Sequence, residues 1–212
     1  MRELLDRMRD MTTSTTAAGD LTPQQWWEVT SPPEQLAARC GALIPAGTGA
    51  LDEEQLETLV TRIAADATIW DPLQVVDADR RRYRLLFEDP RVDVWVLSWM
   101  PGQGTGFHDH DLSSVGLACA QGVVTERQML LPTGATTVEM TAGSSRRGGP
   151  GYIHSVAHHS GEPAITIHAY SPPLERVGQY RVDEAGVLRR SIEHGRQELL
   201  DNSIAEIDPG RA

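Results

Sequence analysis

The chain has 212 residues, 40% hydrophobic and 23% charged, which is ordinary for a globular domain with a buried core. Its 30 acidic residues outnumber 19 basic ones and give a net charge of −11, so a surface for non-specific nucleic-acid binding is excluded. No stretch has the character of a membrane span or signal-peptide core, and Cys40 and Cys119 form no CxxC pair. We therefore expect a cytoplasmic monomer with no membrane or nucleic-acid partner.

The sequence predicts three regions along the chain. Residues 1–33 are expected to form a partly flexible N-terminal extension, since residues 12–19 carry little apolar bulk. Trp26 and Trp27 predict that a later part of this extension docks onto a surface that the sequence does not identify. The folded domain is expected over residues 34–190, and a C-terminal tail over residues 191–212.

The clearest helix is expected over Leu51–Trp70. Asp52 can cap its first turn, and Gln55 stands three residues later, where it completes a capping box. The apolar residues that follow repeat at helical spacing, as expected for a helix with one face on a core: Leu56, Leu59, Val60, Ile63 and Ala64.

After Pro72 the pattern changes to short β-strands. The strand candidates are Arg81–Phe87, Asp93–Met100, Gly122–Met129 and Ala164–Tyr170, separated by turns that carry Pro and Gly. Residues 93–100 are almost all apolar, which is typical of a strand buried on both faces. The sequence therefore predicts a mainly β fold that is closed or sandwiched.

Three histidines have the spacing of a metal site. Residues two apart on a strand point to the same side, so His108 and His110 would project into one cavity. Gly102 precedes them as in the first cupin motif, and Gly151 precedes His154 as in the second. This resemblance implies a cupin fold, that is, a double-stranded β-helix or jelly-roll barrel with N-terminal helices packed outside. It also implies that His108, His110 and His154 bind the metal.

One departure from the cupin pattern bears on the ligand. Cupins usually place a glutamate ligand four or five residues after the second histidine, where this chain has Ser114 and Val115. The site would then offer three neutral imidazoles and no carboxylate. A divalent ion there keeps its full charge and should favour an anionic ligand such as a thiolate.

Longer motifs resemble the cysteine dioxygenase-like thiol dioxygenases of the cupin superfamily. They are residues 99–110 (WMPGQGTGFHDH), 152–156 (YIHSV) and 162–173 (EPAITIHAYSPP). The resemblance covers roughly residues 35–185. It implies an Fe(II) cofactor, a small thiol and O₂ as substrates, and a sulfinic acid as product.

The resemblance also assigns catalytic roles to one strand. Alternation puts Thr166, His168 and Tyr170 on one face of Ala164–Tyr170. That face resembles the family's hydroxyl–histidine–tyrosine relay, in which His168 would orient Tyr170 beside the oxygen site. A buried structural His–Tyr pair is the simpler alternative.

Arginines before the second strand provide candidate substrate contacts. Arg84 matches the arginine that binds the substrate carboxylate in cysteine-type members, and a guanidinium suits that geometry. Arg82 would share its face, as a second substrate contact beside Tyr170. A solvated run of charge is the alternative for this segment.

Val115 stands where animal members carry the cysteine that crosslinks to the tyrosine, so we expect no crosslink. The substrate stays open among cysteine, 3-mercaptopropionate and a bulkier thiol such as ergothioneine. Two other functions stay open as well: a non-catalytic cupin that binds a small anion or thiol, and a zinc-dependent cupin isomerase or hydrolase.

Overall fold

The computed structural model describes residues 32–131 and 134–194. The expected docking segment with Trp26 and Trp27, and most of the expected tail, lie outside these residues. Within them, no helix has the length and apolar character needed to cross a membrane.

Short helices precede the strands. They are α2 (Glu34–Gly41), α3 (Glu53–Ala64) and α4 (Ala67–Trp70), followed by the 3₁₀ turn η2 (Asp71–Leu73). The capping box at the start of α3 is confirmed: Asp52 accepts from the Gln55 amide at 2.8 Å, and the Gln55 side chain accepts from the Asp52 amide at 3.0 Å. The α3 helix therefore begins where the sequence predicts.

The single helix expected over Leu51–Trp70 is wrong in its second half. The chain leaves the helix at Ala65, and Asp66 caps the new short helix α4 by accepting from the Thr68 amide at 3.1 Å. A short polar side chain that bonds to a nearby amide competes with the helical pattern. The break turns α4 so that Ile69 and Trp70 are buried.

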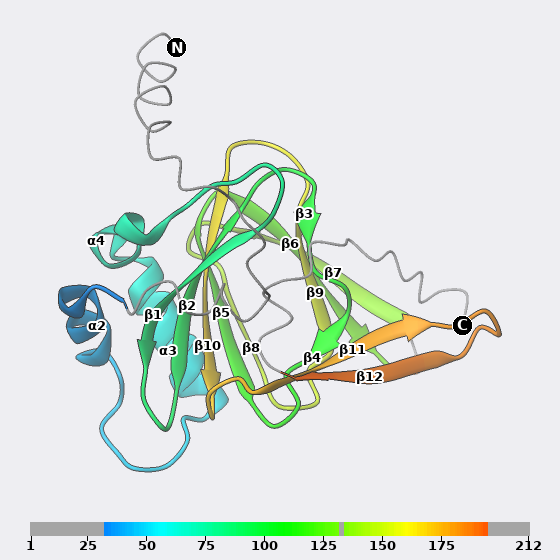
Figure 1. The fold of residues 1–212 in the computed structure, drawn as a ribbon, viewed down its shortest axis with the longest axis horizontal. Coiled ribbons are helices and arrows are strands. Elements are labelled where there is room, and N and C mark those ends of the chain that lie inside the picture. Colours follow the sequence, from blue (N-terminus) through cyan, green and yellow to red (C-terminus); the bar gives the residue numbers. More distant parts are fainter. Residues whose placement is uncertain (1–31, 132–133, 195–212) are drawn as a thin grey trace, which may run out of the picture. The chain divides into compact units, whose positions relative to one another are not determined.

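The strands form two antiparallel sheets, and Figure 1 shows them as separate layers. The first sheet has the order β1 (Arg82–Glu88), β2 (Asp93–Trp99), β10 (Ala164–Ser171), β5 (Ser114–Gln121) and β8 (Ser145–Gly148). The second has the order β12 (Leu188–His194), β11 (Arg176–Val182), β4 (His108–Asp109), β9 (His154–His158), β6 (Val123–Leu130) and β7 (Gly134–Thr141), with β3 (Gln103–Gly104) paired to β9. Strand β12 thus continues past residue 190, where the sequence places the end of the domain.

The mainly β, sandwiched fold with helices packed outside that the sequence predicts is confirmed. The helices pack on one face of the first sheet, where Leu56, Leu59 and Ile63 of α3 share a core with Val96 and Ile167. The contact is so close that a Cβ on Gly116 of β5 would lie 2.7 Å from the backbone of α3. The helix-covered face therefore belongs to the hydrophobic core, and the opposite face of the same sheet is left for polar side chains.

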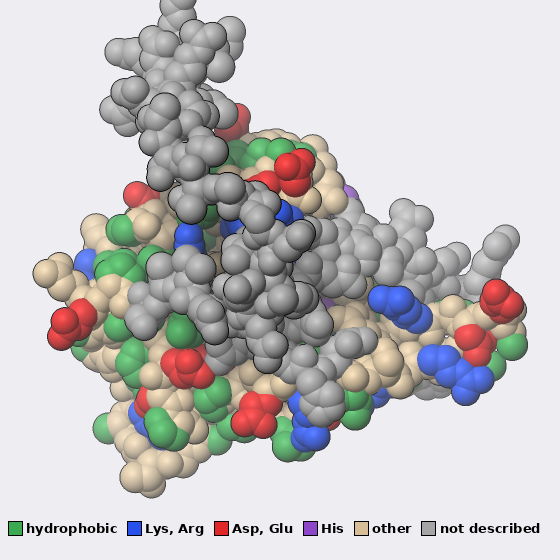
Figure 2. All heavy atoms as spheres, in the orientation of Figure 1, with side chains coloured by type: hydrophobic (Ala, Val, Ile, Leu, Met, Phe, Trp, Pro, Cys, Tyr) green, Lys and Arg blue, Asp and Glu red, His purple; other side chains and the backbone are tan. Residues whose placement is uncertain are grey.

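The outer surface and the interior differ in their ionisable groups. On the described part of the face in Figure 2, acidic and basic side chains are interspersed. His108, His110 and His154 are instead fully buried. The histidines that the sequence singles out therefore lie inside the protein.

Candidate metal centre

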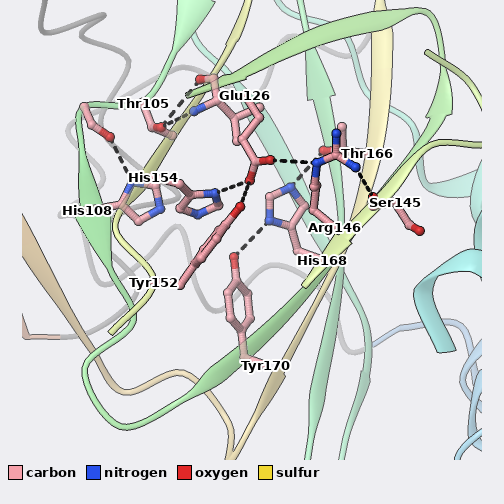
Figure 3. A network of polar contacts seen from close by, with 12 residues as sticks. Thr105, His108, Glu126, Ser145, Arg146, Tyr152, His154, Thr166, His168 and Tyr170 are labelled. Atoms are coloured by element: carbon pink, nitrogen blue, oxygen red, sulfur yellow. Dashed lines mark hydrogen bonds and ion pairs between the residues drawn. The ribbon is translucent and has the colours of Figure 1, made fainter. Parts of the chain in front are cut away.

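Three buried histidines from two adjacent strands meet between the sheets. His108 is in β4 and pairs with His154 in β9, and His110 follows directly after β4. Their ligand atoms lie within 4.8 Å of one another, and their ring centroids are 4.7–5.1 Å apart. The structure thus brings together all three residues that the sequence proposes as ligands, in an arrangement that could hold one metal ion. Figure 3 shows two of them, His108 and His154, side by side.

Hydrogen bonds turn two of these rings toward the cluster. The Nδ1 atom of His108 lies 2.9 Å from the Gly106 carbonyl oxygen, and Nδ1 of His154 lies 2.8 Å from Oε1 of Glu126. Both partners accept, so each Nδ1 donates and each Nε2 keeps its lone pair. Among the described residues, the buried Nε2 of His154 has no hydrogen-bond partner. A buried acceptor of this kind suits a metal ligand.

Glu126 is a buried carboxylate behind His154 that sequence reasoning missed. It lies in β6, is 3% exposed, and also accepts from the Tyr152 hydroxyl at 2.9 Å. Desolvation acts to raise the pKa of Glu126, but the bonds from His154 and Tyr152 and the charge of Arg146 outweigh it, so the pKa is lowered. The alternation in β6, where Val124 and Glu126 are buried, signals that the side chain points inward. The pattern does not show that Glu126 forms hydrogen bonds with His154 and Tyr152.

A second buried carboxylate stands behind the other two histidines. Asp109, between His108 and His110, accepts from Arg190 Nε and Nη2 at 2.7 and 2.8 Å and from the Tyr180 hydroxyl at 2.8 Å. Burial acts to raise the pKa of Asp109, but the hydrogen bonds from Arg190, the Asp111 amide and Tyr180 lower it to about 2. The hairpin β11–β12 is therefore tied through Asp109 to the strand that carries the ligands.

Gly178 explains how Arg190 reaches that carboxylate. A Cβ on Gly178 would lie 2.4 Å from Nε of Arg190, so the arginine crosses β11 directly over the glycine. Gly178 pairs with Asp109 on one side and Ile192 on the other. A side chain at this position would obstruct the path of the guanidinium.

The relay predicted on β10 is formed as a chain of hydrogen bonds. Nδ1 of His168 lies 3.1 Å from the Tyr170 hydroxyl, and its Nε2 lies 3.0 Å from the Thr166 hydroxyl. All three side chains are buried, and the rings of Tyr170 and His110 are 5.0 Å apart. The relay therefore lies beside the three histidines, on the face of the first sheet that is opposite to the helices. Figure 3 shows Thr166, His168 and Tyr170 in line on that strand, near His108 and His154.

Trp99 extends this chain and sets its direction. The Trp99 Nε1–H donates to the Thr166 hydroxyl oxygen at 2.8 Å, because an indole can only donate. Among the described residues, the acceptor for the Thr166 proton is Nε2 of His168. His168 then donates from Nδ1 to the Tyr170 hydroxyl oxygen. Trp99 was not among the predicted site residues.

The strand next to the relay carries no thiol beside the tyrosine. Val115 of β5 is paired with Tyr170, while Cys119 is paired with Thr166, near the other end of the relay. The Cys119 Sγ lies 3.4 Å from the Gln121 carbonyl oxygen, and burial raises the pKa of this thiol to about 11. This geometry keeps the buried thiol away from the Tyr170 ring.

We expected Arg84 and Arg82 to face the site, and the pairing of β1 with β2 turns both toward the other face of the sheet. Arg84 is paired with Val96, whose side chain lies in the helix-covered core, so Arg84 points away from the relay. Arg82 shares that face, because it lies two residues away, and forms an ion pair with Asp77. The motif match identified the arginine-rich segment, but the register of β1 against β2 turns these two side chains to the other face.

Tyr83 lies on the relay side by its register in β1, and Arg81, just before β1, lies there by its contacts. Tyr83 is paired with Leu97, and the centroid of its ring lies 5.9 Å from that of Trp95. Arg81 is 2% exposed, lies 4.8 Å from the centre of the Trp99 ring, and donates to the Gly104 carbonyl oxygen at 3.1 Å. Arg81 is therefore the arginine of this segment that lies beside the relay.

A pocket of about 480 Å³ reaches His110 from the protein surface. Its lining includes Leu112 and Ser113, which follow His110 in the chain, and Pro172 and Pro173, which follow the relay strand β10. The pocket therefore borders one of the three histidines and the segment that follows the relay strand.

The comparisons with known proteins agree with this site. A family model described as cysteine dioxygenase type I matches residues 46–183, a range that contains the three histidines, Glu126 and the relay. The chain is 28% identical over 135 residues to the cysteine dioxygenase type 1 of Homo sapiens and to that of Pongo abelii. Each match covers 58% of this chain and 66% of the relative's length.

Solved structures with some similarity include TT1209 from Thermus thermophilus, with 19% identity and a TM-score of 0.44 over 49% of this chain and 93% of that one. Another is an uncharacterized conserved protein with a double-stranded beta-helix domain from Klebsiella pneumoniae. It has 17% identity and a TM-score of 0.44 over 59% of this chain and 87% of that one.

Proposed function

The chain belongs to the cysteine dioxygenase type I family, and from this premise we propose that it is an Fe(II)- and O₂-dependent thiol dioxygenase. Its substrate would be a small thiol that bears a carboxylate, and its product the corresponding sulfinic acid. The observation that carries the proposal is the position of the Tyr170 relay beside three buried histidines, 5.0 Å from the His110 ring.

The residues present fit a metal ion. The donors are three buried imidazoles, and the Nδ1 atoms of His108 and His154 are held by other acceptors, so their Nε2 atoms remain as donors. Imidazole suits iron, zinc and copper alike, and iron is assigned here from family membership. Iron bound there would supply the electron transfer that allows triplet O₂ to react with a thiolate.

The proposed reaction balances without an external reductant. The thiol RSH and O₂ combine to RSO₂H: the O–O bond breaks, two S–O bonds form, and the electrons lost by sulfur reduce the two oxygen atoms. The Tyr170 hydroxyl would hydrogen-bond to the reacting groups, and His168 and Thr166 would hold its orientation. Both oxygen atoms of the product would therefore come from O₂.

For the substrate carboxylate we propose Arg81 in place of Arg84. Arg81 lies on the relay side against Trp99, and a guanidinium can give two parallel hydrogen bonds to a carboxylate. Cysteine and 3-mercaptopropionate both carry such a group, as does the bulkier ergothioneine. The physiological thiol, the cytoplasmic location and the monomeric state stay predictions.

A thiol panel tests the proposed function. The iron-loaded protein is incubated with cysteine, 3-mercaptopropionate or ergothioneine under ¹⁸O₂, and products are analysed by mass spectrometry. We expect a sulfinate with two labelled oxygen atoms, and no turnover without O₂. An iron-loaded protein that consumes no O₂ with any of these thiols would contradict the proposal and favour a non-catalytic binding protein. Activity with zinc in the absence of O₂ would favour an isomerase or hydrolase.

A further inference from the structure

We propose that Glu126 is a positioning residue for the metal centre: it fixes the ring and tautomer of His154 and supplies the negative charge that the three imidazoles lack. The inference rests on the proposed metal site, although not on the identity of the thiol. Glu126 lies in β6, outside the segments that carry the histidines and the relay.

Two donors converge on one oxygen atom of Glu126. Oε1 accepts from Nδ1 of His154 at 2.8 Å and from the Tyr152 hydroxyl at 2.9 Å, and the rings of these two donors lie 5.0 Å apart. An ionised carboxylate can only accept, so it requires the Nδ1–H tautomer of His154. Nε2 of His154 then keeps a lone pair directed at the other histidines.

The acid and the ligand sit on paired strands, which fixes their separation. Glu126 of β6 is paired with Val156 of β9, and Gln128, two residues further along β6, is paired with His154. Tyr152 is held in turn by Gly148, because a Cβ on that glycine would lie 2.1 Å from the tyrosine ring. The orientation of His154 is therefore set by sheet geometry and close packing.

Charge distinguishes His154 from His108. Nδ1 of His108 donates to a neutral carbonyl, that of Gly106, whereas Nδ1 of His154 donates to a carboxylate. A charge-assisted hydrogen bond makes the imidazole a stronger donor to a metal. Arg146, whose side chain is 37% exposed, approaches the other oxygen at 3.4 Å and offsets part of the charge.

Glu126 also provides a carboxylate for a site that lacks the glutamate ligand of the first cupin motif. Ser114 and Val115 stand where a cupin glutamate would bind the metal directly. Glu126 lies behind the imidazole of His154 and would not bind the metal itself. Its negative charge would act on the metal through His154, and it would occupy no coordination position. The centre therefore keeps positions for exogenous ligands and still gains a negative charge.

The test is a metal-affinity comparison that does not depend on activity. Metal-free wild type, E126Q, Y152F and E139Q are titrated with Co(II) against a competing chelator. Glu139 is an exposed glutamate in the adjacent strand β7, so E139Q makes the same chemical change away from the site. We expect E126Q to weaken metal binding by about 10- to 100-fold, and Y152F by less, because Y152F leaves the His154 bond intact. The E139Q variant should match the wild type.

Two further measurements keep the outcomes separate. Unfolding of each metal-free variant shows whether E126Q merely destabilises the fold, and NMR of ¹⁵N-labelled Zn(II)-loaded wild type reports the His154 tautomer without any substitution. We expect a protected Nδ1–H signal for His154. A His154 protonated at Nε2, or an E126Q affinity equal to that of E139Q, would overturn the inference. A wild-type chain that binds no metal would instead contradict the proposed function.

Discussion

The two walls of the site differ in the kind of group that supports them. On the first sheet, the relay wall is a chain of four neutral polar side chains: Trp99, Thr166, His168 and Tyr170. On the second sheet, the ligand wall consists of His108, His110 and His154, backed by the buried carboxylates Asp109 and Glu126. Each of these carboxylates has an arginine beside it, Arg190 and Arg146 respectively.

The difference fits the task that we propose for each wall. Groups that hold a cation gain from nearby negative charge, and buried carboxylates require hydrogen bonds and a counter-charge to stay ionised. A chain that orients a hydroxyl proton needs only a fixed order of donors and acceptors, which Trp99 provides as an obligate donor. Substitutions in the two walls should therefore separate metal binding from reactivity.

The largest effect is expected from the ligand wall itself. H154A removes one of three donors and leaves Glu126 without the ring that it orients. We expect metal affinity to fall by at least about 100-fold, with loss of turnover, as measured by metal content after dialysis. H159A, at an exposed position nearby, serves as the control. Stoichiometric metal in H154A would remove this histidine from the ligand set.

The relay wall should show the opposite pattern. Y170F removes only the hydroxyl at the end of the relay, so metal content should stay at the wild-type level while kcat falls by about 100-fold. Metal analysis and sulfinate formation are measured on the same preparation. If turnover is unchanged, the relay is a structural His–Tyr pair, and the contrast between the walls loses its functional meaning.

The β11–β12 hairpin supports the ligand wall through the ion pair of Arg190 with Asp109, and this support should contribute to the free energy of unfolding. R190A leaves the buried Asp109 without its main charge partner, and we expect a loss of about 2 kcal/mol in the free energy of unfolding of the metal-free protein. R189A, at the preceding position in the same strand, breaks an exposed ion pair with Asp183 and should cost much less stability, because exposed pairs are screened by solvent. The free energy of unfolding of both variants is measured by urea denaturation. Equal losses for R190A and R189A would show that the buried Asp109 does not require Arg190 as a charge partner.

The smallest effect concerns the substrate. R81Q should raise KM about tenfold for a carboxylate-bearing thiol, because a charged hydrogen bond is lost on the relay side. R84Q removes an arginine whose side chain lies on the helix-covered face of β1 and should leave KM unchanged. The KM values of R81Q and R84Q are measured by steady-state kinetics with 3-mercaptopropionate. A higher KM in R84Q alone would show that the register-based assignment is wrong.

Much of the site follows from local patterns in the sequence. Alternation along a strand places Thr166, His168 and Tyr170 on one face, and the spacing of His108 and His110 places both rings on one side. The capping box at Asp52 is equally local, since both its residues belong to the first turn of the helix. In each case the geometry depends on residues only two or three positions apart.

What the sequence by itself determined was therefore the mainly β fold, the three histidines and the relay face. Only the tertiary structure decided which arginines face inward and which acids stand behind the ligands. The pairing of β1 with β2 turned Arg84 toward the helix-covered core, and the pairing of β6 with β9 brought Glu126 to His154. The physical reason is that register is a relation between strands distant in the chain, and a shift of one residue reverses every side chain.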